Sequence, residues 1–139
     1  MKSQGTKITG HLALQLAVAD LGATEAFYAG ILDIPLKRGL TARGGPEHLI
    51  IEYKGSDLIF VEEEAVLQAH PVLGERFDYP KGVGLTLHFR VQEIEDIYQA
   101  ILEEGLEILY PLEEKPYGLK DIWCFDPDGY LVVLEEFSS

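Results

Sequence analysis

The polar side chains best suited to bind a metal or a ligand lie at matching places in two similar halves of the chain. Gln15 and His88 hold the same position in the stretches LQLAV and LHFRV. Glu62 and Glu135 hold the same position in the later stretches LIFVEE and LVVLEE. Imidazole and carboxylate groups bind divalent metals, but they also serve as polar walls of ligand clefts. A doubled pattern of this kind predicts a cleft built from two similar halves, with these residues in it.

The first half contains one predicted helix and four predicted strands. Residues 11–18 alternate between apolar and polar side chains, which indicates a strand with one packed face. Asp20 follows as a candidate N-cap, and an apolar stripe over 21–32 predicts a helix. Further strands are predicted at 36–42, 48–53 and 58–63, the last two joined by a turn. The predicted order is β-α-β-β-β.

A break in the pattern separates the two halves. Residues 66–79 contain Pro71 and Gly74 and lack a sustained period, so they are predicted to be a linker. Part of this linker is compatible with a short helix. The linker divides one domain, 1–139, into a first module, 1–65, and a second module, 80–139.

The second module repeats the order of the first. Residues 85–91 form a predicted strand, and apolar spacing from Ile94 to Leu102 predicts a helix that stops at Gly105. The segment 126–129, DPDG, predicts a tight turn, in which proline sets φ and glycine takes the left-handed conformation. The remaining strands are predicted at 107–111, 121–125 and 130–137.

Size and composition limit the classes of function. A chain of 139 residues with 47% hydrophobic residues indicates one soluble globular domain. The formal charge of -13 opposes nucleic-acid binding and favours a cationic ligand, or serves solubility alone. The first ten residues lack the apolar core of a signal peptide, and no stretch is long enough to span a membrane. The single cysteine, Cys124, excludes an internal disulfide and favours a cytoplasmic location.

Two contiguous motifs stand out, ADLGATEAFYAGIL at 19–32 and CFDPDGYLVVLEE at 124–136. Together they resemble the vicinal oxygen chelate superfamily, which contains glyoxalase I, extradiol dioxygenases, fosfomycin-resistance transferases and bleomycin-resistance proteins. The resemblance extends over about residues 10–137. It implies an α+β fold in which two βαβββ modules curl into a shared cleft, with the helices on the outer face.

The resemblance also implies where a metal would bind. Metal-using members supply two ligands from each module, one in the first strand and one in the last. Counting from the two motifs places these positions at Ala13, Phe60, Thr86 and Val133. None of them offers a strong metal donor. The resemblance therefore favours the bleomycin-resistance-like branch, whose members bind ligands without metal or chemistry, and it predicts no cofactor.

An alternative metal site lies two residues along each strand. A shift of two keeps a side chain on the same face of a strand, and it gives Gln15, Glu62, His88 and Glu135. This set would hold one divalent metal, such as Zn, Ni, Mn or Fe, in a lyase, isomerase or dioxygenase. In the other interpretation, the same four side chains form a polar, acidic wall of the cleft.

The predicted cleft combines this wall with an aromatic floor. Trp123 and Phe125 alternate on one strand, so they would share a face that suits a planar or cationic compound, although core packing is the alternative. Cys124, between them, is expected to face the helices. We expect a small-molecule-binding homodimer whose clefts both chains complete, as the resemblance implies. The predicted ligand contacts are Gln15, Phe60, Glu62, His88, Arg90, Trp123, Phe125, Val133 and Glu135.

Overall fold

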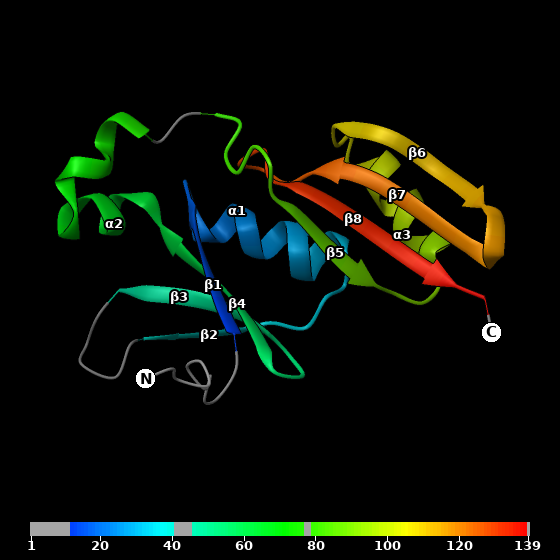
Figure 1. Cartoon of the computed structure of the whole chain (residues 1–139), viewed down its shortest axis with the longest axis horizontal. Coiled ribbons are helices and arrows are strands. Elements are labelled where there is room, and N and C mark those ends of the chain that lie inside the picture. The colour runs from blue at the N-terminus through cyan, green and yellow to red at the C-terminus, as the bar shows by residue number, and fades with distance from the viewer. Residues whose placement is uncertain (1–11, 41–45, 77–78, 139) are drawn as a thin grey trace, which may run out of the picture.

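Two four-stranded sheets form the framework of the protein. The structure, a computed structural model, describes residues 12–40, 46–76 and 79–138. Sheet A has the strand order β1-β4-β3-β2, and sheet B has the order β5-β8-β7-β6 (Figure 1). In both sheets the first strand of the module runs parallel to the last, and the other neighbours are antiparallel. The predicted α+β fold with two βαβββ modules is confirmed.

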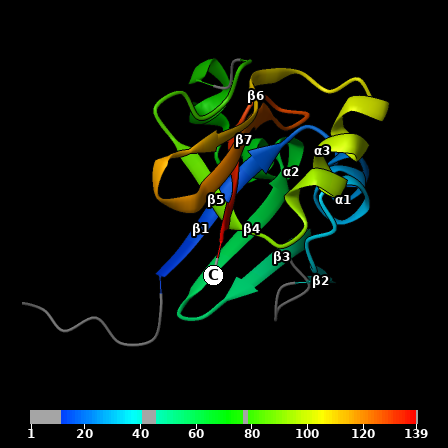
Figure 2. The ribbon, with the colours of Figure 1, turned by 90° about the vertical axis from the view of Figure 1, so that its right-hand side faces the viewer.

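The first module holds sheet A and one continuous helical segment. Its strands are β1 (Leu12–Val18), β2 (Lys37–Leu40), β3 (Glu47–Tyr53) and β4 (Ser56–Glu62). Figure 2 shows β1, β4 and β3 side by side. The helical segment is α1 (Leu21–Glu25), which widens into the π-helical η1 (Ala26–Ile31). Asp20 is its N-cap, as predicted, because the carboxylate accepts a hydrogen bond from Gly22 N–H at 3.0 Å.

Short helices occupy much of the predicted linker. Helix α2 (Glu63–Ala69) starts directly after β4, before the predicted boundary at residue 66. The 3-10 helix η2 (Pro71–Arg76) follows it. Lys81 Nζ lies 2.8 Å from Glu63 Oε2, so an ion pair joins the start of the second module to α2.

The second module holds sheet B and helix α3. Its elements are β5 (Thr86–Arg90), α3 (Ile94–Glu103), β6 (Ile108–Lys115), η3 (Pro116–Gly118), β7 (Leu119–Phe125) and β8 (Leu131–Phe137). Gly129 completes the predicted DPDG turn with φ of 88°. A Cβ atom there would lie 2.6 Å from Pro80 Cβ, so the turn requires glycine for two independent reasons.

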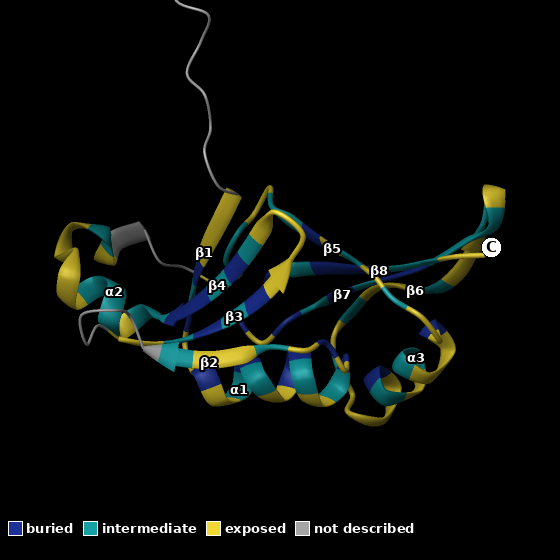
Figure 3. Cartoon of the chain, turned by 90° about the horizontal axis from the view of Figure 1, so that it is seen from below, coloured by how far each residue is buried: buried dark blue, intermediate teal, exposed yellow. Residues whose placement is uncertain are grey.

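The two modules share one hydrophobic core. Helix α1 packs on β3 and β4, helix α3 packs on β7 and β8, and α3 meets η1. Both helices lie below the strands in Figure 3. Tyr28 is fully buried, and its ring contacts Phe60 of the first module and Phe89 of the second, with centroids 4.8 Å and 6.1 Å away. Among the described residues, no helix is long and apolar enough to cross a membrane.

The DPDG turn also joins the modules. Asp126 Oδ1 accepts hydrogen bonds from the N–H groups of Asp128 and Tyr130, as expected of a turn aspartate. Its Oδ2 accepts a hydrogen bond from the Tyr28 hydroxyl at 2.7 Å, and Asp128 Oδ1 accepts one from Ala19 N–H at 2.8 Å. Two aspartates of the second module thereby anchor it to the first, Asp126 at η1 and Asp128 just before the N-cap of α1.

Candidate functional site

In sheet B, the side chains that could contact a ligand lie on the face turned away from α3. Residues paired directly across a ladder point to the same side of the sheet. The pairing therefore defines two neighbouring rows on this outward face, His88–Val133–Trp123 and Arg90–Glu135–Asp121. Phe125 lies one row further, paired with Leu131. All six predicted contact residues of the second module thus lie on one face, while Cys124 is buried on the other, as expected.

In sheet A, the predicted contact residues do not share a face. Gln15 pairs with Ile59, whereas Leu16 pairs with Phe60, so Gln15 and Phe60 point to opposite sides. Gln15 is exposed, while Phe60 is fully buried against the ring of Tyr28. The prediction that Phe60 lines the cleft is wrong, because Phe60 belongs to the hydrophobic core.

Glu62 also lies on the core side of sheet A, at the end of β4. Its Oε2 accepts a hydrogen bond from Leu21 N–H at 3.0 Å, at the start of α1. In sheet B, Glu136 makes the corresponding contact with two N–H groups at the start of α3. Glu62 therefore corresponds to Glu136, and the expected match with Glu135 is one residue out of register. For this reason the prediction that Glu62 faces the cleft is wrong.

The alternative four-residue metal set does not assemble on one face. His88 and Glu135 lie on the outward face of sheet B, but Gln15 and Glu62 point to opposite sides of sheet A. Within the described parts of the chain, no three His, Cys, Asp or Glu side chains are grouped closely enough to hold a metal ion.

The positions implied by the family resemblance are donor-poor in the structure as well. In the observed strand register, Ile59 and not Phe60 is the residue of β4 on the outward face that corresponds to Val133. Ile59 is also apolar. Ala13 is exposed on β1, and Thr86 is partly buried at the start of β5. Val133 is fully buried.

A histidine–carboxylate pair and an arginine lie near the open edge of the outward face. His88 Nδ1 is 3.3 Å from Glu135 Oε1, and the two side chains are 48% and 20% exposed. The guanidinium of Arg90 lies over the ring of Phe137, 4.3 Å from its centroid. Arg90 forms no ion pair with any carboxylate that the structure describes.

Asp121 is the least satisfied polar group of this face. It is only 6% exposed, and its Oδ1 has no hydrogen-bond partner among the described residues. Its Oδ2 accepts one long hydrogen bond, 3.4 Å, from Trp123 Nε1. The Trp123 ring makes T-shaped contacts with the rings of Tyr110 and His88, with centroids 5.7 Å and 6.2 Å away. A buried carboxylate oxygen without a donor costs about 1–3 kcal/mol or more, so Asp121 Oδ1 is an unfilled hydrogen-bond acceptor.

Sequence reasoning passed over Asp121 and Tyr110 as site residues. A signal for Asp121 was available, because it alternates with Trp123 and Phe125 and must share their face. Tyr110 could not be placed in the same way. The pairing of β6 with β7 shifts on both sides of Tyr110, so counting along the strand does not give its partner.

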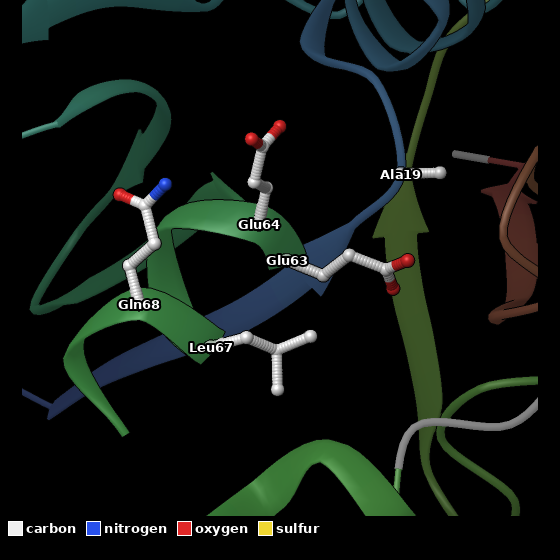
Figure 4. Close-up of a pocket in the computed structure, with 5 residues that line it drawn as sticks. All are labelled: Ala19, Glu63, Glu64, Leu67 and Gln68. Atoms are coloured by element: carbon white, nitrogen blue, oxygen red, sulfur yellow. The ribbon is translucent and has the colours of Figure 1, made fainter. Parts of the chain in front are cut away.

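Two cavities bear on the search for a site. The larger, about 1190 Å³, lies between the modules and is lined by β5, the adjoining ends of β3 and β4, and the loop after η1. The smaller, about 440 Å³, lies at the start of α2 (Figure 4). There, Glu63 and Glu64 point apart, and Glu63 is already paired with Lys81, so we assign the smaller cavity no ligand.

Comparison with known proteins agrees with this architecture. The model of the Glyoxalase/Bleomycin resistance protein/Dioxygenase superfamily matches residues 8–134. The chain belongs to this superfamily. Comparison with curated protein sequences gives no match.

Solved structures share the fold at low sequence identity. A superfamily member from Sphaerobacter thermophilus DSM 20745 has 19% identity and a TM-score of 0.61, covering 93% of this chain and 98% of its own. A glyoxalase/bleomycin resistance protein/dioxygenase from Nocardioides has 19% identity and a TM-score of 0.65, with coverage of 96% and 87%. A protein of unknown function from Agrobacterium tumefaciens str. C58 has 21% identity and a TM-score of 0.66, with 98% of both chains covered.

Proposed function

We propose that this protein binds a small, planar organic cation on the outward face of sheet B, without a metal. The observation that carries the proposal is the buried Asp121 carboxylate, whose Oδ1 has no partner among the described residues. An N–H group of a cationic ligand would supply the missing donor, and such charged hydrogen bonds contribute about 1.5–3 kcal/mol. The formal charge of -13 would attract the same cation from a distance.

Trp123 would bind the aromatic part of the ligand. An indole face is the strongest aromatic partner for a cation, and the rings of Tyr110 and His88 make T-shaped contacts with this indole. Because Asp121 Oδ1 is covered, a ligand must displace a side chain to reach it. Trp123 is well suited to move, since its own hydrogen bond to Asp121 is long at 3.4 Å.

Sequestration, without chemical conversion, is the mechanism that these features support. The family-implied metal positions hold Ala13, Thr86, Val133 and, in the corrected register, Ile59, none of which is a strong metal donor. The bleomycin-resistance-like branch, which this departure favours, binds ligands without chemistry. The function would then be to bind and sequester a toxic or signalling cation on the outward face of sheet B.

We also propose that the protein is a cytoplasmic homodimer in which a second copy completes each cleft. Tyr110 and Phe137, on the outward face of sheet B, are 50% and 45% exposed, and Tyr117, in η3 between β6 and β7, is 99% exposed. A second copy would cover these apolar surfaces. The free thiol of Cys124, the only cysteine, fits a reducing compartment. Sedimentation velocity tests the dimer, and a monomer at every concentration would overturn it.

The binding proposal is tested by calorimetric titration of the full chain with two ligands of nearly the same shape. 9-Aminoacridinium is a planar cation with N–H donors, and acridine is its neutral analogue. We expect the cation to bind at least about tenfold more tightly, the equivalent of roughly 1.4 kcal/mol. Trp123 is the only tryptophan, so its fluorescence reports whether binding occurs beside it.

Two variants separate the specific contact from general attraction. Asp121→Asn removes the buried carboxylate, while Glu103→Gln removes one negative charge from an exposed site. We expect Asp121→Asn to weaken cation binding by about tenfold or more and Glu103→Gln to leave it nearly unchanged. Equal binding by both variants would sink the proposed contact. A tightly held metal, about one per chain and required for binding, would overturn the metal-free part.

A further inference from the structure

The large cavity between the modules has an unpaired strand edge as one wall. Strand β5 pairs with β8 alone, so its other side has no strand neighbour. Val91 N–H donates to the carbonyl of Glu135 at 2.8 Å, on the β8 side. Because backbone groups alternate sides along a strand, the N–H and C=O groups of His88 and Arg90 point to the open side. The edge of β5 therefore offers backbone donors and acceptors to the cavity.

The dimensions and the floor of this cavity suit an extended chain. All residues of β5 line it, and five residues at about 3.3 Å each give an edge of roughly 17 Å. Leu14, Ile34 and Leu58 contribute apolar surface to the other walls. The volume of about 1190 Å³ is larger than most pockets for drug-sized molecules, which hold about 300–1,000 Å³.

The charges around the cavity favour a cationic occupant. Arg90 is its only lysine or arginine among the described residues. The carboxylates that line it come from both modules, and they are Asp33, Glu52, Asp57, Glu93, Asp96 and Glu135. Oppositely charged side chains on a partner would complement this rim and increase its rate of association.

We propose that the open edge of β5 binds an extended, lysine- or arginine-rich peptide segment, which adds to sheet B as a further strand. Main-chain hydrogen bonds to the β5 edge would supply affinity, and alternate side chains would supply specificity. Apolar side chains of the peptide would face Leu14, Ile34 and Leu58, and its cationic side chains would face the carboxylates that line the cavity. The main contacts of this surface differ from those of the proposed small-cation site, because Asp121 and Trp123 do not line the cavity, and His88 borders both.

The peptide side of the contact can be tested with three synthetic octapeptides and the full chain. The first alternates valine and lysine, and the second alternates valine and glutamate. The third repeats the first but carries N-methyl groups on alternate backbone amides, which block strand pairing and leave the charge unchanged. We expect fluorescence polarisation to show that the first binds at least about tenfold more tightly than either control. Two lost hydrogen bonds account for that factor in the N-methylated peptide, and repulsion by the acidic rim weakens the valine–glutamate peptide.

Variants of the protein test the same contact from the other side. Arg90→Pro removes an N–H group that points to the open side and takes no part in pairing with β8. Arg90→Ala is its matched control, because it removes the same side chain and keeps the N–H group. We expect the proline variant to bind the valine–lysine peptide roughly two- to twelvefold more weakly than the alanine variant.

Charge and fold are checked in parallel. Asp33→Asn should weaken binding by roughly two- to fivefold at low salt and by less at high salt. Asparagine suits this position because the φ of Asp33 is 58°, in the left-handed region that Asn tolerates. Circular dichroism establishes whether Arg90→Pro folds. If it does not, the N-methylated peptide decides the question alone.

Hydrogen exchange distinguishes a bound peptide from a second copy of this chain. The amides of His88 and Arg90 should exchange rapidly in the free protein and slowly with the valine–lysine peptide. Slow exchange of both amides before peptide is added, in a sample that sediments as a dimer, would mean that a second copy occupies the edge, and it would overturn the proposal. Equal binding of the N-methylated or the valine–glutamate peptide would overturn it as well.

Discussion

Replacement of Asp126 by asparagine should change how the stability of this protein depends on pH. Asp126 is only 4% exposed, and burial raises the pKa of its carboxyl from 3.8 to about 6. Hydrogen bonds from Tyr28 and from two backbone N–H groups lower this pKa, but the effect of burial is larger. The native state therefore favours the neutral carboxyl, whereas the unfolded chain ionises it near its ordinary pKa.

The sign and size of the effect follow from these two values. A pKa raised on folding contributes stability that is fully present below about pH 3.8 and is lost as pH rises through about 6. At about 1.4 kcal/mol for each pH unit between the two values, the loss is roughly 3 kcal/mol. The asparagine side chain stays neutral throughout, so Asp126→Asn should gain about that amount relative to the wild type between pH 4 and pH 8.

Urea unfolding at several pH values, followed by circular dichroism, measures this difference. Taking the difference between variant and wild type at each pH removes the contribution of the other carboxylates. Tyr28→Phe is a useful companion, because it deletes the hydroxyl that donates to Asp126 at 2.7 Å and should steepen the loss of stability. A constant difference between Asp126→Asn and wild type, or one that falls with pH, would refute the reasoning.

Three further predictions concern the core, the helix start and the cysteine. Phe60→Ala should lower the free energy of unfolding by about 3–5 kcal/mol, whereas Gln15→Ala should stay within about 0.5 kcal/mol; similar losses in urea would contradict their placement on opposite faces. Glu136→Ala should cost about 1–2 kcal/mol, and an unchanged urea midpoint would exclude its capping role. Burial raises the pKa of the Cys124 thiol to about 12, so a thiol reagent should react with it in urea but not in buffer.

Much of the architecture was predictable because its signals are local. The alternation of residues 11–18 and the helical spacing after Ile94 each arise within a few residues, and β1 and α3 form there. The DPDG turn was predictable for the same reason. Its second role, the hydrogen bond between Asp126 and Tyr28, joins residues 98 positions apart, and no local pattern indicates such a contact.

The site was harder to predict because it depends on strand register. The last strands of both modules are nearly continuous apolar runs followed by several glutamates, so alternation does not show which side chains face the core. A slip of one residue moves every side chain of a strand to the other face. That slip placed Phe60 and Glu62 in the cleft, although both lie on the core side.

The amino-acid sequence by itself determined the doubled βαβββ order, the N-cap, the glycine turn and the superfamily, because each of these rests on short-range periodicity or on a contiguous motif. Only the tertiary structure decided which glutamate caps each helix, which strand edge remains open, and that one oxygen of Asp121 lies buried without a donor among the described residues. Those properties arise from the pairing of β1 with β4, β5 with β8 and β7 with β8, in which distant segments pack together and one residue of register reverses the outcome.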